Sequence, residues 1–185
     1  LGWIKKQQEK LRSQERETPR DYITRESHYF MGKRYLLKIT ETDATQTVVL
    51  RHREIELVVK KGADLKQKQK LLEDWYRKRL RQSAGKYIAF WEKQMNLKVA
   101  EFGIKRMRTK WGSCNREAKR IWLNLELAKK PKECLEYIVV HEMVHVLERN
   151  HGTRFVALMD QFLPQWRQYK DELNRLPVGH SNWRY

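Results

Sequence analysis

The chain has 185 residues, of which 40% are hydrophobic, and it carries a formal net charge of +17. This length suits a folded domain with a buried core, and seven Trp and eight Tyr argue against an intrinsically disordered chain. Two cysteines are too few for a disulfide scaffold, and no apolar run is long enough to span a membrane. We therefore expect a cytoplasmic protein with reduced thiols, and because the sequence begins with Leu1 rather than Met, we expect a truncated N-terminus.

The positive charge is concentrated in the middle of the chain. Residues 63–120 carry 17 basic and 6 acidic side chains, a net charge of +11, whereas residues 1–62 have a net charge of +5 and residues 121–185 of +1. A strongly basic segment can attract DNA or another polyanion, but the same composition is typical of a solvated helix face. Both interpretations stay open from the sequence.

The N-terminal part of the chain is predicted to form a charged helix followed by strands. Residues 1–20 contain few apolar side chains and are predicted as a short helix that ends near Pro19. Residues 28–39 indicate a hairpin that turns at Gly32. Two further strands are predicted at residues 47–50 and 54–59.

A long helix is predicted next, with Asp64 as its N-cap and apolar side chains at steps of three, four or seven residues. A kink is expected near Ala84–Gly85. Residues 97–109 and 120–126 are predicted strands, and the turn between them is expected to carry Gly112.

Helices are predicted for the C-terminal third of the chain. One is expected to start near Pro131 and to end at Gly152, and the next to be capped by Thr153. Pro164 should kink or split that last helix. The order of helix, strands, long helix, strands and helices indicates an α+β protein.

The segment His141-Glu142-Met143-Val144-His145 has the spacing of a metal site on a helix. Its two histidines project from one helix face, one turn apart, where two imidazoles can bind one Zn²⁺. Glu142 lies beside the first histidine, where a carboxylate can accept a proton from water activated by the metal. Because apolar residues 137–140 precede the motif, we expect it to be buried rather than a chance surface pair.

A catalytic zinc site usually has three protein ligands, with the fourth position kept for water. His151, ten residues after His141, is the predicted third ligand, which requires the chain to turn back after the helix. Glu148 and Asp160 are the alternatives, although Glu148 lies only three residues after His145, from where the same ion is hard to reach. Metzincins space their third histidine in the same way but have a glycine where this chain has Glu148, so the chain is not a standard metzincin.

Four segments carry a family resemblance: residues 107–114 (MRTKWGSC), 121–124 (IWLN), 141–145 (HEMVH) and 150–155 (NHGTRF). Together they resemble the YgjP-like metallopeptidase family, which is related to the WLM and SprT-like zincins. A Trp-Gly-Ser-Cys turn upstream of H-E-x-x-H is more specific than H-E-x-x-H alone. The similarity in the order of elements extends over residues 28–173.

The resemblance implies a minimal zincin-like metallopeptidase fold of the α+β class. In this fold a small, mostly antiparallel sheet packs on helices, and the H-E-x-x-H helix lies in the core. It also implies a zinc-dependent peptidase acting on a peptide or protein substrate, with Glu142 as general base and with three metal ligands, His141, His145 and His151. The strand at residues 120–126 is expected to offer its edge to an extended substrate, as zincin strands do.

We also predict from the sequence how the chain is divided. Residues 1–62 are expected to form an N-terminal helix and β-hairpin region, and residues 63–185 the zincin core, with both parts packed as one compact domain. Family members commonly have a strand pair before the point where this chain begins, which supports the expected truncation.

Other side chains near the motif receive weaker assignments. Trp111 and Gly112 are expected to be structural, and Cys114 and Cys134 to be buried thiols rather than metal ligands. His180 is expected to be a solvent-exposed residue of the tail. No spacing selects an oxyanion stabiliser among the three candidates Arg108, Lys110 and Arg154.

Two further hypotheses belong to different functional classes. In one, the chain is a nucleic-acid-associated zinc module, or a protease held close to DNA, that docks through the basic residues 63–120. In the other, it is an inactive zincin that serves as an interaction domain, which the intact Glu142 argues against. Neither substrate specificity nor oligomeric state can be predicted from the sequence.

Overall fold

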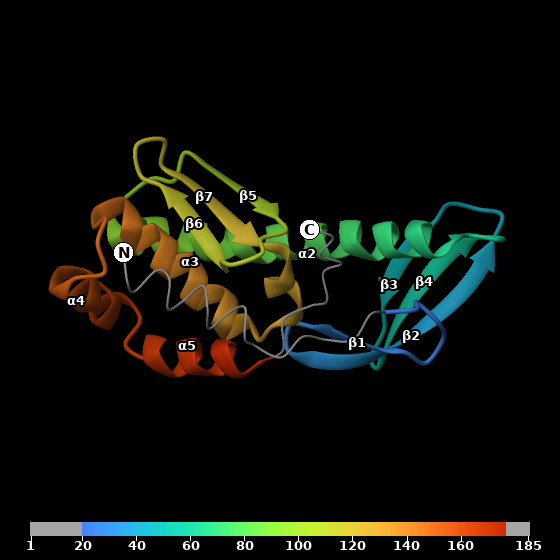
Figure 1. Cartoon of the computed structure of the whole chain (residues 1–185). Coiled ribbons are helices and arrows are strands. Elements are labelled where there is room, and N and C mark those ends of the chain that lie inside the picture. Colours follow the sequence, from blue (N-terminus) through green and yellow to red (C-terminus); the bar gives the residue numbers. More distant parts are fainter. Residues whose placement is uncertain (1–19, 177–185) are drawn as a thin grey trace.

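The computed structural model describes residues 20–176, so the helix predicted at residues 1–20 and the tail with His180 lie outside the described residues. Figure 1 shows the arrangement of the elements. In chain order they are β1 (Ser27–Phe30), β2 (Lys33–Thr42), β3 (Thr47–Leu50), β4 (Glu54–Lys60), α2 (Leu65–Met95), β5 (Glu101–Lys105), β6 (Gly112–Asn115), β7 (Arg120–Asn124), the 3-10 helix η1 (Leu125–Lys129), α3 (Lys132–Leu147), α4 (Thr153–Phe162) and α5 (Trp166–Arg175).

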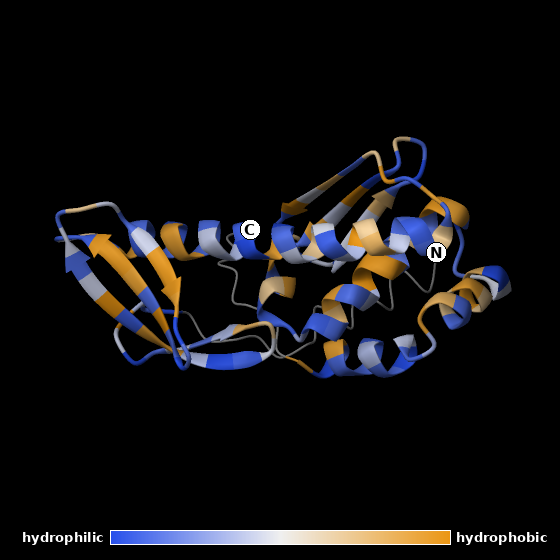
Figure 2. Cartoon of the chain, turned by 180° about the vertical axis from the view of Figure 1, so that it is seen from behind, coloured by the Kyte–Doolittle hydropathy of each residue, from blue (hydrophilic) through white to orange (hydrophobic). Residues whose placement is uncertain are grey.

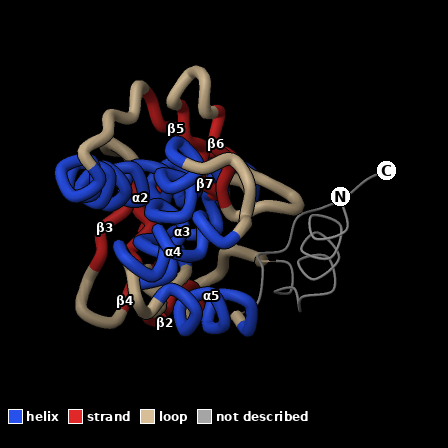
Figure 3. The backbone as a smooth tube through the Cα atoms, turned by 90° about the vertical axis from the view of Figure 1, so that its left-hand side faces the viewer, coloured by secondary structure: helices blue, strands red, loops and turns tan. Residues whose placement is uncertain are grey.

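Helix α2 connects the two halves of an elongated molecule. Its N-terminal half lies beside a four-stranded sheet of order β1-β2-β4-β3, and its C-terminal half lies beside a three-stranded sheet of order β5-β7-β6 (Figure 1). Seen along the molecule, the three-stranded sheet lies on one side of α3 and α5 on the other (Figure 3). Helix α3 is therefore enclosed by a sheet and helices.

The first sheet confirms the predicted hairpin. Strands β1 and β2 pair antiparallel around a turn in which Met31 and Gly32 both have positive φ. This turn packs on η1, because the amide of Met31 donates to the carbonyl of Ala128 at 2.9 Å and the amide of Gly32 to that of Lys129 at 3.2 Å. A Cβ at Gly32 would lie 3.0 Å from Pro131, so the close approach also favours glycine there. The hairpin is thus held against the segment that leads into α3.

The predicted long helix is confirmed as α2. Asp64 is its N-cap and forms a capping box with Gln67, and Asn96 ends the helix in the left-handed conformation at φ 49°. The helix runs continuously through Ala84 and Gly85, where a kink was expected. Figure 2 shows a largely hydrophilic outer side with hydrophobic residues at intervals, and the buried ones are Leu72, Trp75, Tyr76, Leu80, Ala84, Ile88, Trp91 and Met95.

The second sheet departs from the sequence prediction at residues 112–115. These residues form strand β6 rather than part of a turn, and the turn to β7 lies at residues 116–119. Strand β7 pairs with β5 on one side and with β6 on the other. Of the predicted strand at residues 120–126, only residues 120–124 are a strand, since Leu125 and Glu126 begin η1. Strand β7 lies in the centre of its sheet and has no free edge for a substrate; the edge nearest α3 is that of β6. A short Gly-Ser-Cys-Asn sequence has low strand propensity, and only pairing with β7 makes it a strand.

Helix α3 is buried almost all round, as a helix in the core should be. Pro131 precedes its first residue, as predicted, but the helix ends at Leu147 rather than at Gly152. Gly152 instead is the N-cap of α4, so Thr153 is the first helical residue and not the cap. Pro164 separates α4 from α5, which confirms the predicted split.

The α+β class and the position of the H-E-x-x-H helix in the core are confirmed. The sheet is in two small pieces, each of which contains one parallel pair, β2 with β4 and β5 with β7, among antiparallel neighbours. Within residues 20–176, no helix combines the length and the apolar character that crossing a bilayer requires.

Candidate metal centre

Three histidines converge at the C-terminal end of α3. His141 and His145 lie one turn apart on the helix, and His151 lies in the loop that leads to α4. Nε2 of His151 is 3.0 Å from Nε2 of His145 and 3.1 Å from Nε2 of His141. Their potential ligand atoms all lie within 4.8 Å of one another, and no other such group of His, Cys, Asp or Glu exists in the described part of the chain. The structure thus brings together the three histidines predicted as ligands.

The geometry of this cluster fits a zinc ion. With Zn–N distances of about 2.0–2.1 Å, two ligand nitrogens of a tetrahedral site lie about 3.3–3.4 Å apart. The Nε2–Nε2 distances of 3.0 and 3.1 Å are close to this value. Three imidazoles also leave one of four positions open, which is the arrangement of catalytic rather than structural zinc sites.

A backbone contact selects the nitrogen that His145 presents to the cluster. Its Nδ1 lies 3.1 Å from the carbonyl oxygen of Glu148, and since a carbonyl can only accept, Nδ1 must carry the proton. The lone pair of the neutral ring is then on Nε2, which faces the other two histidines. In contrast, the buried Nδ1 of His141 has no hydrogen-bond partner among residues 20–176.

The turn that carries His151 back is stabilised from the three-stranded sheet. Glu148 leaves the helix with an extended backbone, φ −136° and ψ 120°. Arg116, in the turn after β6, donates from Nε to the carbonyl of Val146 at 3.0 Å and from Nη2 to that of Leu147 at 3.4 Å. These carbonyls belong to the last turn of α3, where they have no partner within the helix. The guanidinium group therefore supplies them with hydrogen-bond donors, and its positive charge interacts favourably with the negative end of the helix dipole.

One aromatic ring supports all three histidines. The centroid of the Phe155 ring lies 5.0 Å from that of His141, 4.7 Å from that of His145 and 4.6 Å from that of His151. Phe155 is 2% exposed and belongs to the first turn of α4. A buried ring in contact with three imidazoles restricts their rotation and excludes water from the back of the cluster.

The environment keeps the histidines neutral. Burial lowers the pKa of His141 well below its usual value, with the neighbouring His145 and His151 adding to the effect. Burial likewise lowers the pKa of His145 and brings that of His151 to about 4. Only the neutral ring can bind a metal, so protons compete weakly for this site at neutral pH.

Glu142 lies in the core beside the cluster. Its side chain is 5% exposed, and burial raises its pKa to about 8, against a smaller opposite effect of Lys110. The carboxylate packs on strand β6, where a Cβ at Gly112 would lie only 2.6 Å from Oε1. Of the oxyanion candidates, Lys110 lowers the pKa of Glu142 through its positive charge, and Nε of Arg154 lies 3.9 Å from Oε2 of Glu148.

Asn124 organises the loop before β6, a role that sequence reasoning missed. Its Nδ2 donates to the carbonyls of Met107 at 3.0 Å and Lys110 at 2.8 Å, and its Oδ1 accepts from the amide of Glu126 at 3.2 Å. Its backbone amide donates to the carbonyl of Trp111 at 2.9 Å. The signal in the sequence was the IWLN segment, where a buried Asn also caps η1.

The alternative ligands have other partners. Glu148 accepts from the amide of Asn150 at 3.1 Å, and Asp160 accepts from Nε1 of Trp166 at 2.8 Å and is paired with Arg167. Both therefore contribute to loop and helix contacts and lie outside the histidine cluster.

Both cysteines are free thiols. Burial raises the pKa of Cys134 to about 12, and burial together with Glu142 raises that of Cys114 to about 11. Protonated thiols are poor metal ligands, and neither residue belongs to the cluster of potential ligands.

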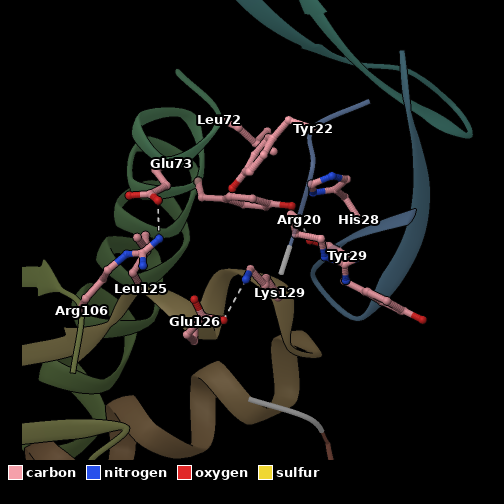
Figure 4. A pocket seen from close by; sticks show the side chains of 11 residues that line it. Arg20, Tyr22, His28, Tyr29, Leu72, Glu73, Arg106, Leu125, Glu126 and Lys129 are labelled. Carbon is pink, nitrogen blue, oxygen red and sulfur yellow. Dashed lines mark hydrogen bonds and ion pairs between the residues drawn. The ribbon is translucent and has the colours of Figure 1, made fainter. Parts of the chain in front are cut away.

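A small cavity lies away from the histidines, between the β1–β2 hairpin, α2 and η1 (Figure 4). Its volume of about 30 Å³ has room for little more than a water molecule. Its polar walls include the ion pairs of Glu73 with Arg106 and of Glu126 with Lys129, and Nε2 of His28 lies 2.6 Å from Oε2 of Glu26. This cavity is therefore a packed polar contact rather than a second candidate site.

The fold and the histidine cluster define a small α+β protein with a metal site on a buried helix. The family model described as "YgjP-like, metallopeptidase domain" matches residues 1–176, so the chain belongs to the YgjP-like family and has its metallopeptidase domain. This confirms the family resemblance of the sequence motifs.

Solved structures with similarity to the chain include two archaeal proteins. One is the metallopeptidase zymogen of Pyrococcus abyssi abylysin, with 14% identity, a TM-score of 0.46, and coverage of 49% of this chain and 90% of that chain. The other is the metallopeptidase zymogen of Methanocaldococcus jannaschii jannalysin, with 20% identity, a TM-score of 0.42, and coverage of 51% and 92% respectively. No curated protein matches the chain.

Proposed function

We propose that this protein is a zinc-dependent peptidase in which His141, His145 and His151 bind the metal and Glu142 is the general base. The observation that carries the proposal is the convergence of three neutral Nε2 atoms at 3.0 and 3.1 Å beside a buried carboxylate. Membership of a metallopeptidase family supports it. A bound zinc ion would act as a Lewis acid on the scissile carbonyl and make water more acidic.

The residues of the chain account for the proton transfers. Glu142 accepts the proton of the attacking water and donates it to the leaving amine. A carboxyl group with a pKa of about 8 holds that proton readily, and the positive charge of a bound metal would favour the carboxylate before attack. We assign the stabilisation of the developing oxyanion to Lys110, supported by the effect of its positive charge on the pKa of Glu142.

Strand β6 is the proposed docking edge for an extended substrate. In its antiparallel register, Gly112 faces Leu123 and Cys114 faces Ile121, and the amide of Asn124 donates to the carbonyl of Trp111. This alternation turns the backbone groups of Gly112 and Cys114 away from β7 and toward the free edge. A peptide added there would form main-chain hydrogen bonds and pass in front of Glu142.

The test is Glu142→Gln, which keeps the shape of the side chain but removes the base. Hydrolysis of fluorescein-labelled casein by the zinc-loaded protein should fall at least about 100-fold. Zinc content, measured by mass spectrometry after dialysis, should stay at one ion per chain. Turnover at the wild-type rate by the variant would contradict the assigned role, and loss of zinc would show that Glu142 supports the metal instead.

A second candidate function, polyanion binding, is favoured by the charge pairing along α2. Its three acidic residues are each ion-paired, Glu73 with Arg106, Asp74 with Lys70 and Glu92 with Lys98. In contrast, several exposed basic residues on α2 have no ion pair within residues 20–176, among them Lys78, Lys86 and Lys93. An uncompensated basic surface of this kind attracts the phosphates of a nucleic acid.

Anisotropy of a labelled 20-base-pair duplex should then show binding at about 50 mM salt that weakens steeply toward 200 mM. Reversing the charges of Lys78, Lys86 and Lys93 to Glu should make log Kd depend less steeply on the logarithm of the salt concentration. The same change at the exposed Lys33, Lys60 and Lys132 should have a smaller effect on that slope. Equal effects of both triple variants would indicate net charge rather than an α2 surface, and no binding at low salt would exclude the function.

A further inference from the structure

Gly112 lies where strand β6 meets the proposed general base. A Cβ at this position would be 2.6 Å from Oε1, 2.8 Å from Cγ and 2.9 Å from Cδ of Glu142. Such distances are below those of real Cβ contacts, so any side chain here requires Glu142 to move. The backbone itself does not require glycine, because the glycines with positive φ in the described chain are Gly32 and Gly62.

The strand is held on its other side by its pairing with β7 and by Asn124. Gly112 pairs with the fully buried Leu123, and the preceding carbonyl of Trp111 accepts from Asn124. Asn124, which is 1% exposed, also holds the carbonyl of Lys110. An added methyl group would therefore displace the flexible end of Glu142 rather than the strand.

Glu142 has little room for such a displacement. Helix α3 is buried before and after Glu142 in the sequence, since Val139, Val140 and Met143 are all 0% exposed. The carboxylate is enclosed between this helix and β6, and helix α3 contacts β6 more extensively than any other strand. Its position relative to His141 and His145 is therefore set by the surface of β6.

We propose that Gly112 is a positioning residue: the absence of a side chain lets the Glu142 carboxylate rest against β6 at the place from which it would transfer protons as the general base. This inference rests on the proposed function of Glu142. Proton transfer demands close placement, and a shift of about 1 Å can cost about 100-fold in rate. Gly112 thereby links the Trp-Gly-Ser-Cys segment to the H-E-x-x-H helix through one contact.

The first experiment is Gly112→Ala in the zinc-loaded full chain, assayed with fluorescein-labelled casein. The kcat should fall about 10–100-fold with a smaller change in KM, while zinc affinity, measured by competition with a chromophoric chelator, stays within about twofold. The matched control is Gly85→Ala in α2, where a Cβ would meet only Phe102 at an ordinary 3.5 Å. That control should retain wild-type kcat.

A double-variant comparison isolates the contact with Glu142. Glu142→Ala removes Cγ, Cδ and Oε1, the three atoms that the added methyl group would approach. Because a variant without the carboxylate lacks the proposed base, the comparison uses unfolding of the zinc-free protein rather than kcat. An equal loss of stability from Gly112→Ala in both backgrounds would mean that Gly112 acts independently of Glu142 and would overturn the proposal.

Thermal unfolding of the zinc-free protein gives a readout that needs no substrate. Gly112→Ala should lower Tm by about 4–8 °C in the wild type, as expected for overpacking, but by less than about 2 °C together with Glu142→Ala. Wild-type kcat and Tm for Gly112→Ala would refute this inference while leaving the general base intact. If Glu142→Gln keeps full activity, the proposed function fails, and the Tm coupling then reports only packing.

Discussion

Contacts within the chain hold the three histidines of the cluster in place, one of them shared by all three rings. His145 is oriented by the carbonyl of Glu148, all three rings pack against Phe155, and His151 reaches the cluster because the chain turns after Leu147. Each contact restricts the orientation or the position of an imidazole ring in the metal-free protein. Preorganisation of this kind lowers the entropic cost of binding an ion.

The lowered pKa values of the histidines predict how zinc binding depends on pH. A lowered pKa means that each ring stays unprotonated until the pH falls well below about 6.5, the usual value for histidine. Zinc affinity should therefore change little between pH 8 and about pH 6 and decline steeply only under more acidic conditions, toward the pKa of about 4 of His151. Competition with a chelator of known pH dependence measures this.

A control peptide shows whether this pH dependence is specific to the buried cluster or common to any histidines. A peptide with unstructured histidines of ordinary pKa should begin to lose zinc near pH 6.5. A protein that follows the same curve as the peptide would show that burial does not protect the histidines from protonation.

At the scale of the elements, the three-stranded sheet depends on a close contact between β5 and β7. Gly103 pairs with Trp122 in the parallel register, and a Cβ at Gly103 would lie 2.3 Å from Cζ3 of the indole ring. The ring thus lies over the backbone of β5, and Nζ of Lys105 covers it at 4.8 Å from the centroid. Because β7 also pairs with β6, this contact fixes the strand that carries Gly112.

Gly103→Ala should destabilise the protein by about 1–3 kcal/mol, since the indole ring must shift in a packed sheet. Gly85→Ala should be neutral or stabilise it by up to about 1 kcal/mol, because alanine is the better helix former and the site has room. Urea denaturation followed by tryptophan fluorescence measures both. Equal free energies of unfolding for the two variants would contradict the assigned packing of Trp122.

At the scale of the whole molecule, the site is assembled from separate parts of the chain. Helix α2 carries the four-stranded sheet at one end and the three-stranded sheet and α3 at the other (Figure 1). The basic side chains are concentrated on α2 and the loops around β5 and β6, while residues 121–185 have a net charge of +1. The proposed zinc binding and the proposed polyanion binding therefore involve different parts of the chain and can be tested separately.

Zinc removal should lower the stability of the whole molecule, because the histidine cluster joins α3 to the start of α4. At a free zinc concentration about 100 times Kd, binding stabilises the native state by about 2.7 kcal/mol, which corresponds to about 5–10 °C in Tm. Differential scanning fluorimetry with and without a chelator measures the shift. His151→Ala should lose most of it, and a full shift in that variant would remove His151 from the site.

The sequence alone determined the local features of the site. The spacing of His141 and His145 places both on one face of a helix whatever the fold, because 3.6 residues make one turn. The capping of α2 by Asp64 and the separation of α4 from α5 at Pro164 are likewise local. The Trp-Gly-Ser-Cys and H-E-x-x-H segments also sufficed to indicate the family that the chain belongs to.

Only the tertiary structure decided the contacts between distant segments. Residues 112–115 become a strand because they pair with β7, and Gly112 touches Glu142 from 30 positions earlier in the chain. Arg116 reaches the end of α3 in the same way, and β7 lies in the centre of its sheet, so that the strand expected from the sequence to offer an edge has none. Such contacts depend on how sheets and helices pack together, and their energies do not appear in the periodicity of any single segment.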